Sequence, residues 1–399
     1  MKPPRILFTR RFTTNAADRL SIGFSGAGFL GCYHVGVAAC LNKHGMIPHP
    51  DDDTNKMPLL TGVSAGSMNA AAACAGVNPE PDGMEVVLEA ARRTRELSTR
   101  QKQVSLDVLT PGFSLIDAVE EPFRDAIVKS LGGYCEKDSS NNIIIHDIDP
   151  DLFSKRFPSG ALRIGIADRR ELWSPPLLKA YRYVDTFRDV EDIVACCMLS
   201  SYVPGITGHA PPSFLDGLTG SVDKSSSAAG RAGVRVKEMA KFGLVRHGKT
   251  GLPVVENVEE TTNSEESKED TSTEPTLYWD GGLAEMFPTF DNNTVIVSPL
   301  NGLYDPNPSI SPGVLDDAKF TDKSGGDTQQ QQHPSQSTAL LQNLLRPYLT
   351  SLLPATFRHC HKSELGLNTK NAQTALKMIF SSDDDELYSR FKEGYDDAR

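Results

Sequence analysis

The sequence predicts an α/β fold built on a mostly parallel central sheet, and a repeated pattern near its start carries this prediction. An apolar strand, Ile22 to Phe24, leads into a glycine-rich turn and then into an apolar helix, Tyr33 to Leu41. The same order of strand, turn and helix returns at Pro58 to Val63 and Ser67 to Ala75. Two such units in succession favour parallel strands, because parallel neighbours need a long, usually helical connection.

Further strands and helices are predicted downstream. Met84 to Leu97 has the apolar spacing of an amphipathic helix, in which Glu89 and Arg93 are placed to pair at i, i+4. Asp189 has the position of an N-cap for a later helix. Strands are predicted at Leu162 to Ala167, Tyr278 to Asp280 and Thr294 to Val297.

Charge and cysteine content exclude several classes of protein. The 399 residues have a formal charge of -11, and residues 256–274 alone hold eight acidic residues against one lysine. Phosphate backbones are bound by clustered Lys and Arg, so we expect no nucleic-acid partner. The seven cysteines form no CxxC pair, which is typical of free thiols in a reducing compartment. We expect neither a metal site nor a cofactor.

Domain organisation follows from changes in composition. Residues 1–19 form a basic N-terminal arm, for which organelle targeting is an open alternative. Residues 20–396 are predicted to form one domain. Within it, the segments 222–275 and 323–338 are poor in apolar residues, and we expect both to be disordered surface insertions because nothing offsets the entropy of ordering them. No apolar run approaches the length of a membrane span.

The stretch GFSGAGFLG at the end of the first strand admits two interpretations. A dinucleotide-binding loop has similar glycine spacing, and Asp51 to Asp53 would then bind a ribose hydroxyl. Alternatively, the backbone amides of Gly26, Ala27 and Gly28 converge on a small anion, such as the oxyanion formed when an ester is attacked. The glycines alone do not decide between the two.

A second glycine-containing turn bears on how the first one is interpreted. A G-x-S-x-G sequence runs from Gly62 to Gly66, between an apolar strand and a helix of small residues. This is the context of a nucleophile elbow, in which glycines relieve a crowded turn and the serine hydroxyl stands at the start of a helix. The helix N-terminus favours negative charge near the reacting oxygen. Ser64 is therefore the candidate nucleophile.

Asp280 is the candidate base. It ends a predicted strand, and Gly281 and Gly282 follow it, leaving the backbone free to turn the carboxylate toward a site. The mechanistic rival is an α/β-hydrolase triad, because His359 and His361 follow Asp280 in the chain order Ser, Asp, His.

These motifs, in this order, resemble the patatin-like phospholipases, and most closely the adipose triglyceride lipase (adiponutrin-like) group of that family. The resemblance rests on GFSGAGFLGCYHVGVAACL, which includes Gly31, on GVSAG and on DGG. It covers residues 20–220 and 276–396. Further matching stretches are PGFSLIDA at 111–118, YVPGITGHAPP at 202–212, NTVIVSPLNG at 293–302 and FKEGYD at 391–396.

The resemblance implies a three-layer α/β/α sandwich and a Ser-Asp dyad that needs no histidine. Ser64 would be the nucleophile, Asp280 the base, and the amides from Gly26 to Gly28 the oxyanion hole. The implied activity is that of a carboxylic ester hydrolase, a triacylglycerol lipase, with phospholipase A or lysophospholipase as the alternative. An alternative of another class is a non-catalytic lipid-binding relative. We expect a cytoplasmic protein, peripheral on a lipid droplet or membrane surface, with a lipid substrate and a protein coactivator as a further candidate partner.

Overall fold

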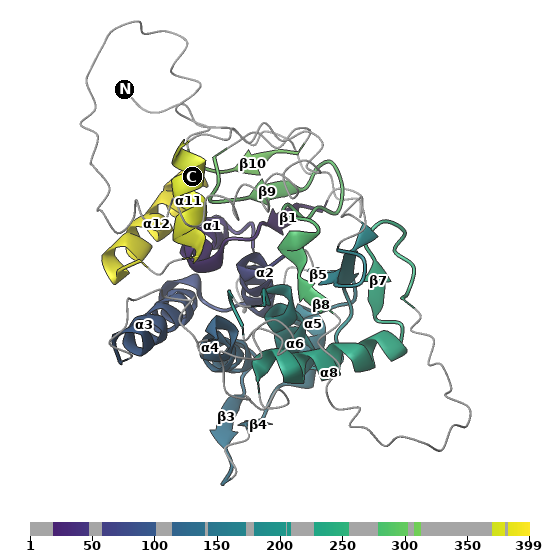
Figure 1. Cartoon of the computed structure of the whole chain (residues 1–399). Helices are drawn as coiled ribbons and strands as arrows, with labels where there is room; N and C mark the ends of the chain where they lie inside the picture. Colours follow the sequence, from purple (N-terminus) through teal and green to yellow (C-terminus); the bar gives the residue numbers. More distant parts are fainter. Residues whose placement is uncertain are drawn as a thin grey trace, which may run out of the picture.

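The computed structural model describes residues 19–47, 58–100, 114–139, 143–172, 179–204, 206–208, 227–254, 278–301, 307–312, 369–379 and 382–399. These residues contain one central sheet with the strand order β10-β9-β1-β2-β5-β6-β7, in which β8 pairs with β5 (Figure 1). The strands are β1 (Ser21–Phe24), β2 (Leu59–Gly62), β5 (Leu162–Asp168), β6 (Tyr181–Val184), β7 (Val245–His247), β8 (Tyr278–Asp280), β9 (Val295–Val297) and β10 (Ser309–Ile310).

The sheet is mostly parallel, as predicted. Strands β10, β9, β1, β2 and β5 run parallel, whereas β6, β7 and β8 join by antiparallel pairing. Phe24 of β1 lies opposite Gly62 of β2, so both glycine turns leave the same edge of the sheet. On β5, Ile166 lies opposite Asp280 of β8. The topology therefore brings the turn after β1, the turn after β2 and the end of β8 together.

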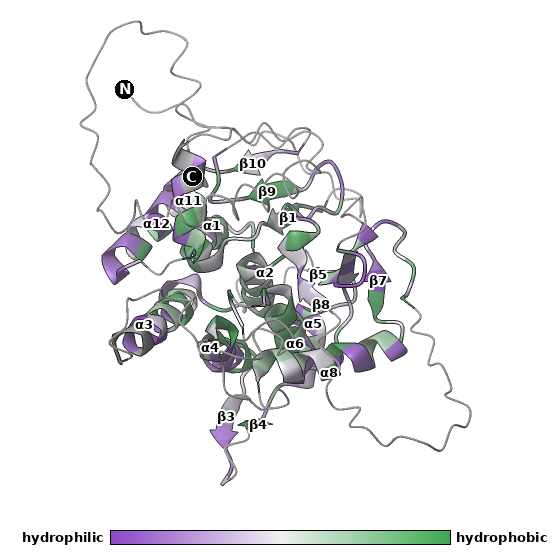
Figure 2. Ribbon diagram, viewed as in Figure 1, coloured by the Kyte–Doolittle hydropathy of each residue, from purple (hydrophilic) through white to green (hydrophobic). Residues whose placement is uncertain are grey.

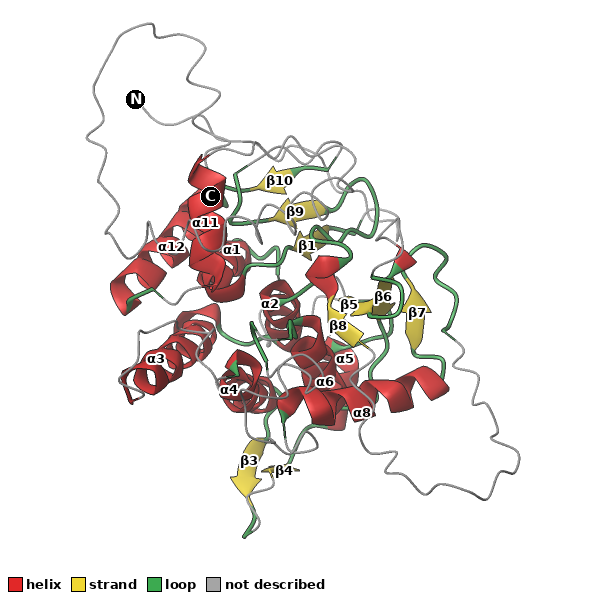
Figure 3. Ribbon diagram, in the orientation of Figure 1, coloured by secondary structure: helices red, strands yellow, loops and turns green. Residues whose placement is uncertain are grey.

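Helices cover one face of the sheet and share a single large core with it (Figure 3). Alternate residues of β1, β2, β5 and β9 point into this core, and Figure 2 shows strong apolar colouring on the central helix α6. The described helices are α1 (Gly31–Lys43), α2 (Ala65–Ala75), α3 (Met84–Arg100), α4 (Leu115–Ser130), α5 (Pro150–Arg156), α6 (Val190–Ser200), α8 (Ala228–Lys241), α11 (Thr369–Ile379) and α12 (Asp384–Asp397).

The opposite face carries a thinner layer. One small cluster gathers around Val63 and Tyr181, and another around Phe287, against which Met378 of α11 packs. The short helix η7 (Gly281–Leu283) runs along this side after β8. A separate hairpin of β3 (Tyr134–Lys137) and β4 (Ile143–His146) extends from the body (Figure 1). None of the helices within the described ranges has the length and apolar character of a membrane span.

The predicted disorder of residues 222–275 is wrong for residues 227–254. Helix α8 begins with Ser227 as N-cap and buries Ala228, Val236 and Met239 in the main core, and β7 then forms the edge of the sheet. Few residues of this helix are large and apolar, so composition concealed an amphipathic stripe. The rest of 222–275, all of 323–338 and the arm 1–18 lie outside the described residues.

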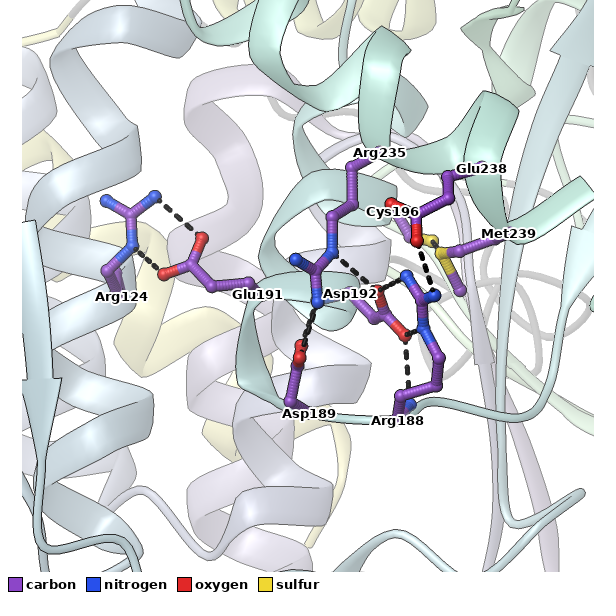
Figure 4. A network of polar contacts seen from close by, with 9 residues as sticks. All are labelled: Arg124, Arg188, Asp189, Glu191, Asp192, Cys196, Arg235, Glu238 and Met239. Atoms are coloured by element: carbon purple, nitrogen blue, oxygen red, sulfur yellow. Dashed lines mark hydrogen bonds and ion pairs between the residues drawn. The ribbon is translucent and has the colours of Figure 1, made fainter.

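Charged side chains hold α8 against α6 (Figure 4). The fully buried carboxylate of Asp192 accepts hydrogen bonds from Arg188 Nε at 2.9 Å and from Arg235 Nε of α8 at 2.7 Å. Burial, the largest influence, raises the pKa of Asp192, but the bonds from the two guanidinium groups outweigh it and hold that pKa below its ordinary value. Asp189 caps α6, as predicted, and also pairs with Arg235.

Helix α12 packs along α1, which is distant in the sequence (Figure 1). A Cβ on Gly36 would lie 1.9 Å from the carbonyl oxygen of Phe391, and a Cβ on Gly394 would lie 2.1 Å from that of Tyr33. The Tyr33 hydroxyl donates to Asp397 at 2.8 Å. The two helices thus touch backbone to backbone, and only glycine fits at these two positions.

Candidate active site

Ser64 lies in a sharp turn between β2 and α2. Its φ of 54° and ψ of -138° place a residue with a side chain in a conformation that L-residues rarely adopt. It is the N-cap residue of α2, so its hydroxyl stands at the positive end of that helix. Strain of this kind persists only where the surrounding structure imposes it, and it clusters at functional sites.

The glycines of the turn are required by close backbone approach. A Cβ on Gly66 would lie 2.3 Å from the carbonyl oxygen of Ser25, and one on Gly62 would lie 2.3 Å from that of Gly66. The start of α2 therefore rests directly on the end of β1, which sets Ser64 beside the first glycine loop.

Ser200, at the end of α6, fixes the turn from behind and was not singled out from the sequence. The backbone N–H of Ser64 donates to Ser200 Oγ at 2.9 Å, and this hydroxyl donates to the carbonyl oxygen of Gly165 at 2.6 Å. Ser200 is fully buried. No local motif marks it, because its role arises only when α6 returns beneath β2.

Asp280 ends β8 and meets Ser64. A hydrogen bond from the Ser64 hydroxyl and another from the Gly282 N–H, at 2.7 Å, both favour the ionised carboxylate. Burial is the larger influence and raises the pKa of Asp280 to about 7. Asp280 is 6% exposed, so the charge of its carboxylate is poorly solvated. The two candidate catalytic residues are thus in contact, and the pKa of the aspartate lies near neutral pH.

The carbonyl oxygen of Gly165 on β5 contacts groups that support both Ser64 and Asp280. Ser200 donates to it, and a Cβ on Gly281 would lie 2.3 Å from it. The same peptide group therefore supports the Ser64 turn through Ser200 and positions the Asp-Gly-Gly turn by direct packing.

The first glycine loop faces Ser64. A Cβ on Gly26 would lie 3.6 Å from Ser64 Cβ, so an added side chain would crowd the nucleophile. The Gly26 amide donates to the carbonyl oxygen of Met286 at 3.4 Å. Within the described ranges, the amides of Ala27 and Gly28 donate to no protein acceptor. Gly28 has a φ of +52°, and Met378 of α11 packs on it. Two amides in this loop are therefore without a protein partner among the described residues.

An apolar cavity of about 110 Å³ begins at Ser64 and lies among α1, α2, α3 and α4. Gly28, Phe29 and Gly31 of the glycine loop line it near Ser64. Beyond them the walls are mostly small or branched apolar side chains, with no charged residue among those that line it. Such a cavity suits a hydrocarbon chain and offers nothing to a phosphate.

The residues on which the alternative sites depend are not described by the structure, and the histidine that follows the glycine loop is buried in the core. His34 is completely buried, and burial lowers its pKa to about 3, so it is neutral and a poor proton carrier at physiological pH. His359 and His361, on which the triad alternative depends, lie outside the described residues, as do Asp51 to Asp53.

Residues 23–291 match the family model described as "Patatin-like phospholipase". The chain belongs to this family. The glycine loop, the Ser64 turn and Asp280 all fall inside the matched patatin-like region, and membership of the family supports lipid acyl hydrolase activity. The sequence-based recognition of the family and of its α/β fold is thus confirmed.

Individual relatives match parts of this patatin-like chain. The human 1-acylglycerol-3-phosphate O-acyltransferase PNPLA3 is 27% identical over 49% of this chain and 31% of its own length. Patatin-like phospholipase domain-containing protein 2 is 29% identical in mouse, over 41% of this chain and 32% of its own length, and 30% identical in human, over 45% and 33%. The matches span about a third of these relatives. The solved structure of VipD from Legionella pneumophila aligns over 97% of this chain and 68% of its own at 12% identity, with a TM-score of 0.29.

Proposed function

We propose that the protein is a serine acyl-ester hydrolase of lipids, and specifically a triacylglycerol lipase with a Ser64-Asp280 dyad. The observation that carries the proposal is the contact between Ser64 and the buried Asp280 at the head of an apolar cavity. A nucleophile hydrogen-bonded to its base, beside a cavity for hydrocarbon, has the parts that ester cleavage of a lipid needs.

In this mechanism Asp280 takes the proton of the Ser64 hydroxyl as the oxygen attacks the ester carbonyl. The oxyanion of the tetrahedral intermediate accepts hydrogen bonds from the Ala27 and Gly28 amides, and Gly26 joins them if its bond to Met286 opens. Asp280 then gives the proton to the departing alcohol, which leaves an acyl group on Ser64. Water attacks this acyl-enzyme, again with Asp280 as base, and releases the fatty acid.

The pKa of Asp280 suits both of its proposed tasks. A general base is most useful when its pKa lies near the working pH, since it must then both accept and return a proton. An exposed aspartate is too weak a base for this work. Burial raises the pKa to about 7, and the neighbouring glycines leave no charged group to lower it again.

Triacylglycerol is proposed because the motifs resemble the adipose triglyceride lipase group. The apolar lining of the cavity does not distinguish the acyl chains of the two lipids, so a phospholipase A is the alternative within the same mechanism. Transfer of the acyl group to an alcohol in place of water is a second candidate, favoured by the relative that is named an acyltransferase. A peripheral position on a lipid droplet or membrane and a protein coactivator stay predictions.

Fatty-acid release from triacylglycerol emulsion and from phosphatidylcholine vesicles tests the proposal. We expect Ser64→Ala and Asp280→Asn each to lower the rate by at least about a thousand-fold. The nucleophile and its base act as a unit, so losing either one removes most of the rate enhancement. Glu285→Gln is the matched control, because burial also raises the pKa of Glu285 to about 7 but its carboxylate accepts its hydrogen bond from the Phe287 N–H.

Three outcomes separate the alternatives. Loss of activity in a His359 and His361 double alanine variant would replace the dyad with a triad. Release from vesicles alone would make the protein a phospholipase. Binding of lipid without release from either substrate would favour the non-catalytic relative.

A further inference from the structure

One hydroxyl group beside Ser64 has no protein partner. The polar side chains that line the Ser64 cavity belong to Ser64, Asn69, Ser201 and Thr207. The Ser64 hydroxyl is bonded to Asp280, and the Asn69 amide donates to the carbonyl oxygen of Ala65 at 2.9 Å. The Thr207 hydroxyl accepts the Val203 N–H at 2.7 Å and donates to the carbonyl oxygen of Ser201. Across the described part of the chain, the Ser201 hydroxyl is the one buried side-chain polar group of this lining without a hydrogen bond.

The burial of Ser201 makes this missing bond significant. Ser201 is 5% exposed, so bulk water does not replace a protein partner there. Buried hydroxyl groups in folded proteins nearly always have a partner, because leaving one without it costs more than the bond itself contributes. An unpaired hydroxyl on a residue that lines a cavity therefore indicates that a molecule in the cavity supplies the partner, and that this partner is polar.

Both chain neighbours of Ser201 are bonded to the candidate dyad. Ser200 Oγ accepts the backbone N–H of Ser64 at 2.9 Å. The carbonyl oxygen of Tyr202 accepts the backbone N–H of Asp280, also at 2.9 Å. Ser201 thus lies between the residue that fixes the nucleophile and the residue that fixes the base, which places it close to both.

Ser201 and the glycine loop approach Ser64 from different sides. The loop precedes α1, whereas Ser201 is the C-cap of α6. Helix α2, which begins at Ser64, packs against both helices and lies between them (Figure 1). The Ser201 hydroxyl is therefore separate from the amides proposed to bind the oxyanion. It lies with Asp280, on the side where an oxygen must exchange a proton with that carboxylate.

We propose that the Ser201 hydroxyl binds the water molecule that attacks the acyl-enzyme, and thereby favours hydrolysis over transfer of the acyl group to an alcohol. Water carries two hydrogens, and Asp280 takes one of them as the oxygen attacks the acyl carbon. Ser201 Oγ accepts a hydrogen bond from the other hydrogen, which directs the lone pair of the water at that carbon. The bond between the acyl carbon and Ser64 Oγ then breaks, and Asp280 returns the proton to Ser64. The second hydrogen leaves on the fatty acid.

An alcohol cannot use this contact. Its single hydroxyl hydrogen goes to Asp280, and the alkyl group that replaces the second hydrogen has nothing to donate to Ser201. The inference rests on the proposed function, since it requires an acyl group on Ser64. It makes Ser201 a residue that determines the choice of acyl acceptor, which the Ser64-Asp280 dyad by itself leaves open.

The test uses p-nitrophenyl butanoate with n-butanol as a competing acceptor. Release of p-nitrophenol in the first turnover reports formation of the acyl-enzyme, and the ratio of butyl butanoate to butanoic acid reports its fate. In Ser201→Ala we expect the first turnover to keep its rate and hydrolysis of the acyl-enzyme to slow about ten-fold, the usual effect of one lost hydrogen bond. The ratio of ester to acid should rise by the same factor.

Three further variants separate this role from a structural one. Ser201→Thr keeps the hydroxyl and should keep the product ratio, whereas Ser201→Cys, a weak acceptor of similar size, should shift it as alanine does. Ser21→Ala removes a buried hydroxyl bonded to Thr294 at the opposite end of β1, and it should leave the ratio unchanged.

The outcomes distinguish the inference from the proposed function. An unchanged product ratio in Ser201→Ala and Ser201→Cys, while p-nitrophenol is still released, would overturn the role of Ser201 and leave the hydrolase intact. Equal slowing of the first turnover and of later turnovers would likewise reduce Ser201 to a structural residue. No p-nitrophenol from the unaltered protein would overturn the proposed function, and the role of Ser201 with it.

Discussion

Helix α6 has a polar group buried at each end, and the two ends are built on opposite principles. At its C-terminal end, the neutral hydroxyl of Ser200 bridges two backbone groups beneath Ser64. At its N-terminal end, the charged Asp192 binds two arginines that hold α8 in place (Figure 4). The first arrangement leaves no room for side-chain movement, whereas the second uses long side chains that adjust. The end beneath Ser64 thus fixes a backbone turn, and the other end attaches α8 to the sheet-covering helices.

The largest effect that this comparison predicts is on stability, at the α8 end. Asp192→Ala leaves Arg188 and Arg235 without their buried partner, and we expect it to lower the free energy of unfolding by about 2–4 kcal/mol. Because both arginines are about one-third exposed, solvent limits the loss. Urea denaturation measures it. A variant as stable as the unaltered protein would contradict the assigned role of Asp192, while hydrolysis per folded molecule should change little.

A smaller loss of stability, accompanied by loss of the proposed activity, is expected at the Ser200 end. Ser200→Ala leaves the Ser64 N–H and the Gly165 carbonyl without their partner, at a cost of about 1–3 kcal/mol. Ser200 touches Ser64 only through the backbone, so it is a positioning residue. We expect kcat to fall about ten-fold with little change in KM, and Ser200→Thr, which keeps the hydroxyl, to recover part of it. A normal kcat in Ser200→Ala would show that the turn holds its shape unaided.

The smallest effect is the dependence of activity on pH. Asp280 must be ionised to act as base, so kcat/KM should rise with pH through about 7 and fall about ten-fold per unit below it. Glu285→Gln should keep this profile, because burial raises the pKa of Glu285 to the same range but its carboxylate binds the Phe287 N–H. If Glu285→Gln abolished the pH dependence of kcat/KM, the titrating group would be Glu285 and not Asp280.

Stability should change in the opposite direction over the same pH range. The folded state binds the Asp280 proton more tightly than the unfolded chain does, so this contribution to stability is present at low pH and lost as pH rises through about 7. Asp280→Asn, which carries no charge, should keep that stability at pH 8 while being inactive. Thermal unfolding at pH 5 and pH 8 tests the sign.

The sequence predicted the parts of the site that depend on local backbone geometry. The glycines around Ser64 and after Asp280 predict sharp turns, because no other residue lets the backbone approach its neighbours so closely. Ser200 could not be found this way, since its role depends on where α6 returns in space. Helix α8 was missed for another reason: its buried stripe is made largely of alanine, and the Ser227 N-cap was its only local signal. The catalytic roles of Ser64 and Asp280 stay predictions until the variants are measured.

The packing of α12 on α1 has a consequence for synthesis of the chain. Helix α1 leaves the ribosome more than three hundred residues before the helix that covers it. Until α12 arrives, Gly36 and Tyr33 face solvent or a chaperone, and the glycine loop that precedes α1 lacks one of its supports. At the usual 5–20 residues per second, that delay lasts about 15 to 70 seconds. The contacts that α12 makes with α1 are therefore absent while the intervening residues are being made, and they form only when these two helices meet.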